Sequence, residues 1–139
     1  MTDLNTSANT VCLDVFGSFS WSPTGDSFIY VAEKLESQDS QSSILLSKYL
    51  DKENFGERLQ EVRMPAMFIL NVKTLKVTEM KVSVESSYKI FPAQPVFIDE
   101  ENIVFMGIPN LSKQLGMTYI FCRPTSIFSM RLSSGQASN

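Results

Sequence analysis

The sequence contains no histidine among its 139 residues. It therefore lacks the residue that serves as the base in Ser-His-Asp and Cys-His hydrolases and as the commonest ligand of catalytic metals. The six glycines are scattered, so neither a phosphate-binding G-x-G-x-x-G or G-x-x-x-x-G-K loop nor a G-x-S-x-G nucleophile elbow occurs. We expect this chain alone to contain no catalytic residue, no cofactor site and no metal site.

Basic residues and long apolar runs are also scarce. Twelve Lys and Arg stand against fifteen Asp and Glu, which gives a net charge of -3 and no dense basic surface for nucleic acid. No apolar run approaches the roughly 20 residues that cross a bilayer, and the first ten residues are polar, unlike a signal peptide. These features predict a cytoplasmic protein that binds neither nucleic acid nor membrane.

The remaining reactive side chains do not form a recognisable site. Cys12 and Cys122 lack C-x-x-C spacing, and we expect two free thiols. Ser18 lies just before a predicted strand and not on a strand-turn-helix corner. Carboxylates cluster in a predicted hairpin tip and in a polar insertion without fixed spacing, so we expect solvated charges rather than an acid-base pair or a metal site. They are Asp99, Glu100 and Glu101 in the tip, and Asp51, Glu53, Glu57 and Glu61 in the insertion.

The composition is globular, and an internal repeat indicates how the chain is organised. Residues 19–27 end in turn-forming side chains and precede the apolar, β-branched run 28–32; about 75 residues later, residues 95–102 precede the run 103–107. Each pair predicts a hairpin. Residues 66–72 then line up with residues 126–132 as third strands, with Phe68, Leu70 and Val72 matching Phe128, Met130 and Leu132 on one face. Residues 75–80 predict a fourth strand.

This order of strands predicts an all-β fold made of the antiparallel, four-stranded blades of a β-propeller, with about two blades present. We place a polar tail at residues 1–14, a first blade at 15–82, a second and incomplete blade at 83–135, and a tail at 136–139. The first blade contains a long polar insertion at residues 33–63, read as a surface loop with a short helix at 44–50; a subunit contact or a flap is the functional alternative. Periodicity alone leaves a generic β-sandwich open.

Six aromatic residues are the expected packing residues between blades. Two blades alone would leave both outer faces bare, so we expect the isolated chain to be molten or prone to aggregate. The six residues are Trp21, Phe28, Tyr30, Phe97, Phe105 and Phe128.

Several segments, in order, resemble the propeller of the acylaminoacyl-peptidases, also called acylpeptide hydrolases, of the prolyl oligopeptidase class. They are Phe-Ser-Trp-Ser-Pro at residues 19–23, Tyr-Val-Ala-Glu-Lys at 30–34, Asn-Phe-Gly-Glu at 54–57 and Leu-Gly-Met-Thr-Tyr-Ile-Phe-Cys at 115–122. Phe55 stands where that family usually has Trp. Trp-Ser-Pro alone is common to many propellers, but the ordered set covers residues 15–132.

The resemblance implies a two-domain cytosolic serine hydrolase that releases N-acylated amino acids from short blocked peptides. Its triad would lie in a C-terminal α/β-hydrolase domain, with the propeller limiting access. This sequence includes neither the remaining blades nor that domain, so no catalytic residue is carried over. The expected partners are those missing parts, N-acylated peptides and, less specifically, further copies of the chain. The alternative is a standalone β-rich interaction module that binds a protein through its strand edges and residues 33–63.

Overall fold

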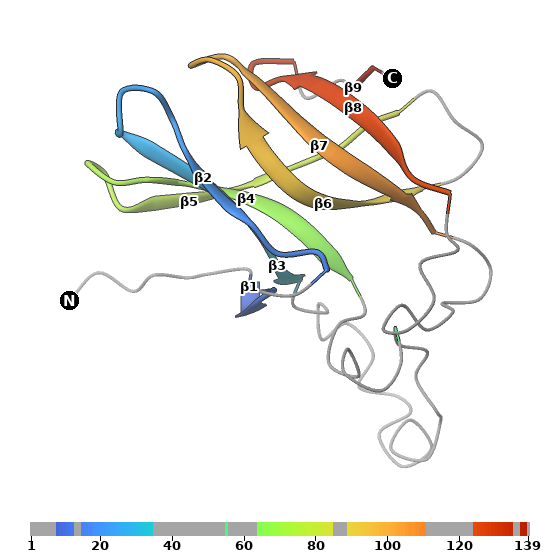
Figure 1. Ribbon diagram of the computed structural model, residues 1–139. Helices are drawn as coiled ribbons and strands as arrows, with labels where there is room; N and C mark the ends of the chain where they lie inside the picture. The colour runs from blue at the N-terminus through green and yellow to red at the C-terminus, as the bar shows by residue number, and fades with distance from the viewer. Residues whose placement is uncertain are drawn as a thin grey trace, which may run out of the picture.

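The computed structural model describes residues 8–12, 15–34, 55, 64–84, 89–110, 124–134 and 137–138. All regular elements within these residues are β-strands, and they form two antiparallel sheets that lie one above the other in Figure 1. The all-β prediction is therefore confirmed. The short helix expected at residues 44–50 lies outside the described residues.

The first sheet is a meander in which β3 is central. One edge of β3 pairs with β4, from Ser27 opposite Asn71 to Glu33 opposite Pro65. The other edge is shared, because β2 pairs with the first half of β3 and β1 with the second half. β1 and β2 thus fill one strand position together, and the sheet is four positions wide. The bounds are β1 Ala8–Val11, β2 Phe19–Trp21, β3 Ser27–Lys34, β4 Pro65–Asn71 and β5 Lys76–Met80.

The second sheet repeats this order as β6-β7-β8-β9. The register between β6 and β7 shifts between Ala93 and Val96, where Gln94 has a φ of 49°. An extra residue of this kind is a β-bulge, which bends a strand and increases its twist. The bounds are β6 Ile90–Phe97, β7 Asn102–Pro109, β8 Ser126–Arg131 and β9 Ala137–Ser138.

Both predicted hairpins form, and each turn has its own local cause. In the β2–β3 turn, Gly25 adopts a φ of 74° and its N–H donates to the carbonyl of Ser22 at 2.9 Å. Positive φ is inexpensive only for glycine, which explains that residue. In the β6–β7 turn, the Asp99 carboxylate accepts from the N–H groups of Glu101 and Asn102, both at 2.8 Å. This is the local bonding by which Asp favours turns.

Two segments that the sequence analysis placed in tails contribute strands. β1 lies within residues 1–14 and pairs with β3, whereas β9 lies within residues 136–139 and pairs with β8. The second sheet therefore has its fourth strand, and the expectation of an incomplete second sheet was wrong. Edge pairing needs only backbone N–H and C=O groups, so short polar sequences can join a sheet without an alternating apolar pattern.

Apolar side chains of both sheets meet in a shared core. One cluster joins Ile29 and Met67 of the first sheet to Ile103, Phe105 and Phe128 of the second. The two rings, Phe105 and Phe128, stack with centroids 5.7 Å apart. Burial of this apolar surface is the main force that holds one sheet on the other.

Polar contacts fix the relative position of the sheets along β2 and β6. The N–H of Phe97 donates to the Ser20 hydroxyl at 3.2 Å, and the Ser18 hydroxyl donates to the carbonyl of Pro95 at 3.2 Å. At the hairpin tips, the N–H of Thr24 donates to the Glu100 carboxylate at 2.6 Å. These bonds connect residues that are 76 or 77 positions apart in the sequence.

The six predicted packing aromatics divide into two groups. Phe105 and Phe128 are buried between the sheets, and Phe97 packs against the same cluster, as expected. Trp21, by contrast, is 56% exposed. Trp21 pairs with Phe28, and the next residue of β3, Ile29, points into the shared core. Because successive side chains of a strand point to opposite faces, Phe28 and Trp21 lie on the face of the first sheet that is turned away from the second. Tyr30 shares that outward face.

One residue of the predicted insertion, Phe55, lies in the core. Its side chain is fully buried and its ring meets those of Phe16 at 4.8 Å and Phe91 at 5.3 Å. Both contacts are edge-on, the arrangement that the ring quadrupole favours. Phe55 therefore ties the insertion to β6, and the reading of residues 33–63 as a surface loop was wrong at this position.

Candidate functional site: the groove and the outward faces

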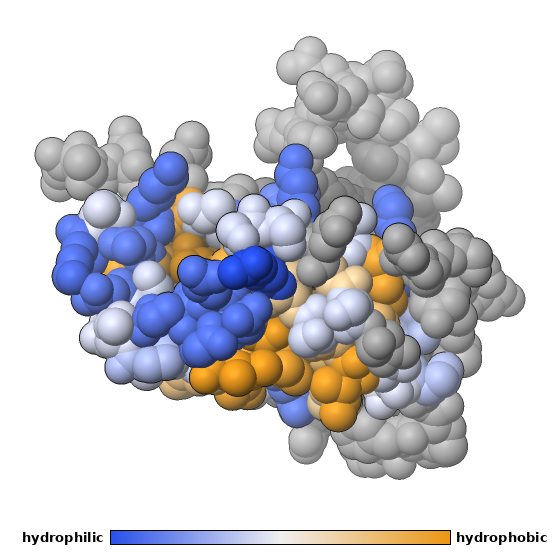
Figure 2. Space-filling model, turned by 90° about the horizontal axis from the view of Figure 1, so that it is seen from above, coloured by the Kyte–Doolittle hydropathy of each residue, from blue (hydrophilic) through white to orange (hydrophobic). Residues whose placement is uncertain are grey.

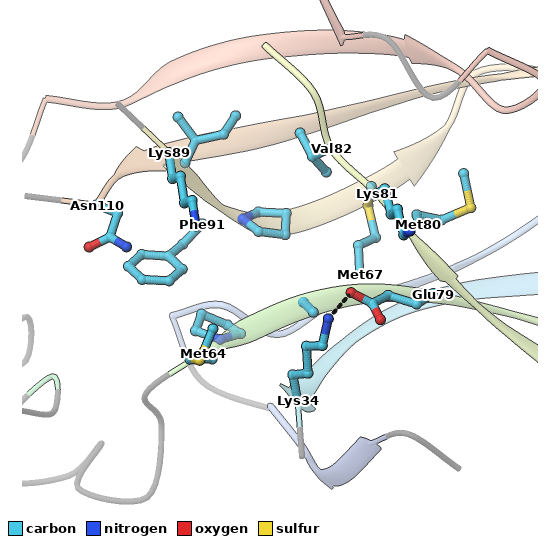
Figure 3. Close-up of a pocket in the computed structure, with 14 residues that line it drawn as sticks. Lys34, Met64, Met67, Glu79, Met80, Lys81, Val82, Lys89, Phe91 and Asn110 are labelled. Carbon is cyan, nitrogen blue, oxygen red and sulfur yellow. Dashed lines mark hydrogen bonds and ion pairs between the residues drawn. The ribbon is translucent and has the colours of Figure 1, made fainter. Parts of the chain in front are cut away.

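A groove of about 340 Å³ lies between the sheets, where β4 and β5 face the start of β6 (Figure 3). Its floor is apolar and rich in methionine, with Met64, Met67 and Met80 on one side and Phe91 on the other. Methionine is flexible and adapts to irregular spaces. The floor of the groove can therefore adapt to the shape of what it contacts.

The rim of the groove is basic. Lys34 and Glu79 form an ion pair at 2.7 Å, which Figure 3 shows crossing below the groove. Lys81 and Lys89 add two further cations on the rim. The described lining contains no Ser, Thr, Cys or His, and its one carboxylate, Glu79, is held in the ion pair with Lys34.

The three carboxylates of the β6–β7 tip have separate roles. Asp99 bonds within the turn, and Glu100 reaches across to the first sheet. Glu101 pairs with Arg131 of β8 at 2.7 Å. Hydrogen bonds from the Asn102 side chain, and then from the backbone of Glu101, hold the pKa of Asp99 below its usual value. A lowered pKa keeps Asp99 ionised, which suits a turn acceptor and does not suit a general acid.

No metal centre is evident among the described residues, since no group of three or more Cys, Asp and Glu side chains lies close enough to bind an ion. The other carboxylates considered above, Asp51, Glu53, Glu57 and Glu61, lie outside the described residues. In the part of the chain that the structure describes, no helix has the length and apolar character needed to cross a bilayer.

The outward face of the first sheet carries a ladder of aromatic rings. Trp21 and Phe28 lie 5.2 Å apart, Phe28 and Tyr30 5.5 Å, and Tyr30 and Phe68 5.8 Å. Burial differs along the ladder: Tyr30 and Phe68 are buried, whereas Trp21 and its neighbour Phe19 are 56% and 64% exposed. The end of this face near the β2–β3 turn is thus an open apolar surface.

The outward face of the second sheet is apolar as well. Val96 pairs with Val104 and Met106 pairs with Ile127, so these four side chains share one face, on which Met106 packs against the buried cluster that contains Phe91. Ile127 is 67% exposed and Val96 50% exposed. Figure 2, which views the molecule from above, shows apolar surface beside strongly hydrophilic surface on this side. Large exposed apolar surfaces usually mark places where another molecule or domain binds.

The thiol of Cys12 is buried beside Val31 and Phe91 and is free. Burial, and then the charge of Glu33, raise the pKa of Cys12 from about 9 to about 11. A raised pKa means that the fold retains a proton which the unfolded chain loses, so stability should fall as the pH rises from about 9 to about 11. Cys122 lies outside the described residues.

We expect Cys12→Ala to remove part of this pH dependence. Unfolding in urea, measured at pH 8 and at pH 10 with Cys122→Ser in both proteins, should show a larger loss of stability at pH 10 for the protein that retains Cys12. Comparing the two proteins cancels every pH effect that they share, including that of Tyr30, whose pKa is raised by burial. An equal loss in both would show that Cys12 does not titrate in this range.

The sequence did not reveal the groove or the outward position of Trp21. The groove joins β4, β5 and β6, and its basic rim comes from lysines that look like ordinary surface charges in the sequence. The hydroxyls of Ser18, just before β2, and of Ser20, within it, are the local features that could have indicated a polar junction between the sheets.

Two antiparallel meanders of four strand positions, equivalent in order and stacked face to face, are two blades of a β-propeller. The family model of the acylamino-acid-releasing enzyme N-terminal domain matches residues 14–139. The chain belongs to this family, which confirms the resemblance seen in its sequence. A comparison with curated proteins found no match.

Proposed function

We propose that this chain is a non-catalytic propeller segment of an acylaminoacyl-peptidase, a serine hydrolase that releases N-acylated amino acids from short blocked peptides. The observation that carries the proposal is the exposed apolar surface on the outward side of each blade, at Phe19 and Trp21 of the first and at Ile127 of the second, which is where neighbouring blades pack in a propeller. The family match supports the same assignment.

The described residues support a structural role for this segment. Its polar side chains form hydrogen bonds within and between the blades, as Ser18 and Ser20 do at the junction and Glu100 does at the hairpin tips. A propeller placed beside a hydrolase domain restricts access by its rigidity, and the shared core and the junction contacts supply that rigidity. Substrate chemistry would then belong to the hydrolase domain, where a triad with its histidine would lie.

The first test concerns catalysis by this chain. Incubated with an acetylated amino-acid anilide, the purified chain should release no more product than buffer does, because it contains no histidine and no nucleophile elbow. Robust turnover that is abolished by a serine-hydrolase inhibitor would overturn the proposal.

The second arm of the test concerns access. A family enzyme whose corresponding two blades are replaced by this chain should retain activity on short blocked peptides and exclude long ones. The same enzyme without the two blades should lose this selection by length. Equal cleavage of long peptides by both proteins would show that the segment does not limit access.

A further inference from the structure

The groove of Figure 3 is walled by both blades, with β4 and β5 of the first on one side and the start of β6 of the second on the other. Its volume of about 340 Å³ lies in the range of sites that hold small molecules. Further blades of a propeller pack on the outward faces of these two, not between them. Neighbouring blades would therefore leave the groove free for a small ligand.

The floor of the groove is suited to an unbranched hydrocarbon chain. Met64, Met67 and Met80 contribute long, unbranched side chains that adapt to the shape of a bound molecule. Pro65 and Pro92 also line the groove and have no backbone N–H. An extended peptide depends on main-chain hydrogen bonds and would find fewer of them here, whereas a hydrocarbon chain needs none.

Two lysines give the rim an unbalanced positive charge. Lys81 directly follows β5 and Lys89 directly precedes β6, so both stand where the chain leaves one blade and enters the other. The one carboxylate of the described lining, Glu79, is already paired with Lys34 at 2.7 Å. No carboxylate among the described residues pairs with Lys81 or Lys89. Although the whole chain has a net charge of -3, this rim attracts anions.

We propose that the groove binds the anion of an unbranched, medium-chain fatty acid. The hydrocarbon chain lies on the methionine floor, and the carboxylate accepts hydrogen bonds from the ammonium groups of Lys81 and Lys89. Three thioethers could also suit Cu(I), but the positive rim would repel a cation. The inference goes beyond the proposed function and does not depend on it. A groove that binds no fatty acid would leave the role of the two blades unaffected.

The apolar floor favours a fatty acid over an N-acylated amino acid. Both ligands have a carboxylate and an apolar part, but the N-acylated amino acid also has an amide that must lose water to enter the groove. The methionine and phenylalanine side chains of the floor offer that amide no strong hydrogen-bond partner. This desolvation costs affinity, and a fatty acid avoids it.

The test uses the full chain with its methionines labelled at the ¹³C methyl group, so that NMR reports on the floor directly. Octanoate, kept below the concentration at which it forms micelles, should shift the signals of Met64, Met67 and Met80 in a saturable way. Affinity should rise about fourfold for each methylene added to hexanoate and then level off when the groove is full. Trp21, the only tryptophan, is exposed on the outward face of the first blade, so its unchanged fluorescence should exclude binding there.

Substitutions on the rim test the role of charge. Lys81→Gln and Lys89→Gln should each weaken octanoate binding by about two- to fivefold, as expected for exposed ion pairs. Lys76→Gln removes the same charge from an exposed position of β5 outside the described lining, and it should leave binding unchanged. Lys81→Glu combined with Lys89→Glu should abolish octanoate binding and allow octylamine to bind instead, a gain that loss of folding could not produce.

The ligand class is tested with N-acetyl-leucine, which has as many carbon atoms as octanoate and should bind at least about fivefold more weakly. Equal affinity for the two would show that the ligand class is wrong. The inference is also overturned if the unmodified chain shows no saturable shifts, if Lys76→Gln weakens binding as much as the rim variants do, or if Trp21 responds together with the methionines.

Discussion

Replacing Phe55 by alanine should lower the free energy of unfolding by about 3–5 kcal/mol, the usual cost of removing a buried phenylalanine ring. Phe55 is fully buried and touches the rings of Phe16 and Phe91, so truncation would leave a cavity with aromatic walls that backbone movement cannot readily fill. Urea unfolding followed by circular dichroism measures the change directly.

Two variants make the Phe55 result specific. Phe55→Leu keeps part of the apolar volume and should cost clearly less than Phe55→Ala. Phe19→Ala removes the same ring from a position that is 64% exposed, and at a concentration low enough to prevent association it should change stability by no more than about 0.5 kcal/mol. Equal effects of Phe55→Ala and Phe19→Ala would mean that Phe55 does not anchor the insertion in the core.

Strand pairs close in sequence were predictable, and contacts between the blades were not. Alternation of apolar residues and turn chemistry identified the hairpins β2–β3 and β6–β7, because both signals act over a few residues. β1 and β9 were missed, since their pairing depends on the backbone of a distant edge. Phe55 was missed as a core residue because a single aromatic in a polar segment has no period, and its partners Phe16 and Phe91 lie far from it in the sequence.

The repeat also explains why the position of Trp21 was misjudged. The sequence shows that Trp21 and Phe97 hold equivalent positions, and it was reasonable to expect both between blades. Equivalent positions face the preceding blade in each repeat, and among the described residues no blade precedes the first one. A repeat pattern therefore identifies which face packs, while the presence of a neighbour decides whether that face is buried.

Gly107→Ala is expected to destabilise the second blade by about 1–3 kcal/mol, the usual cost of overpacking a core. A Cβ at this position would lie 2.3 Å from Cε2 and 2.6 Å from Cδ2 of Phe128. Phe128 cannot simply move aside, because its ring is stacked on Phe105 and buried between the blades. The methyl group must therefore displace either the ring or the backbone of β7, and the loss should appear in urea unfolding as a lower midpoint.

The cause can be isolated by making room for the new methyl group. Phe128→Leu removes the clashing ring atoms, so the double variant should be at least about 1 kcal/mol more stable than the sum of the two single effects predicts. Gly25→Ala is the matched control: its added Cβ meets nothing within 4 Å, and its cost of about 1 kcal/mol would come only from the φ of 74°. Phe128→Leu should not reduce that cost. If Gly107→Ala and Phe128→Leu are simply additive, the close approach of β7 to the stacked rings is not what requires glycine at position 107.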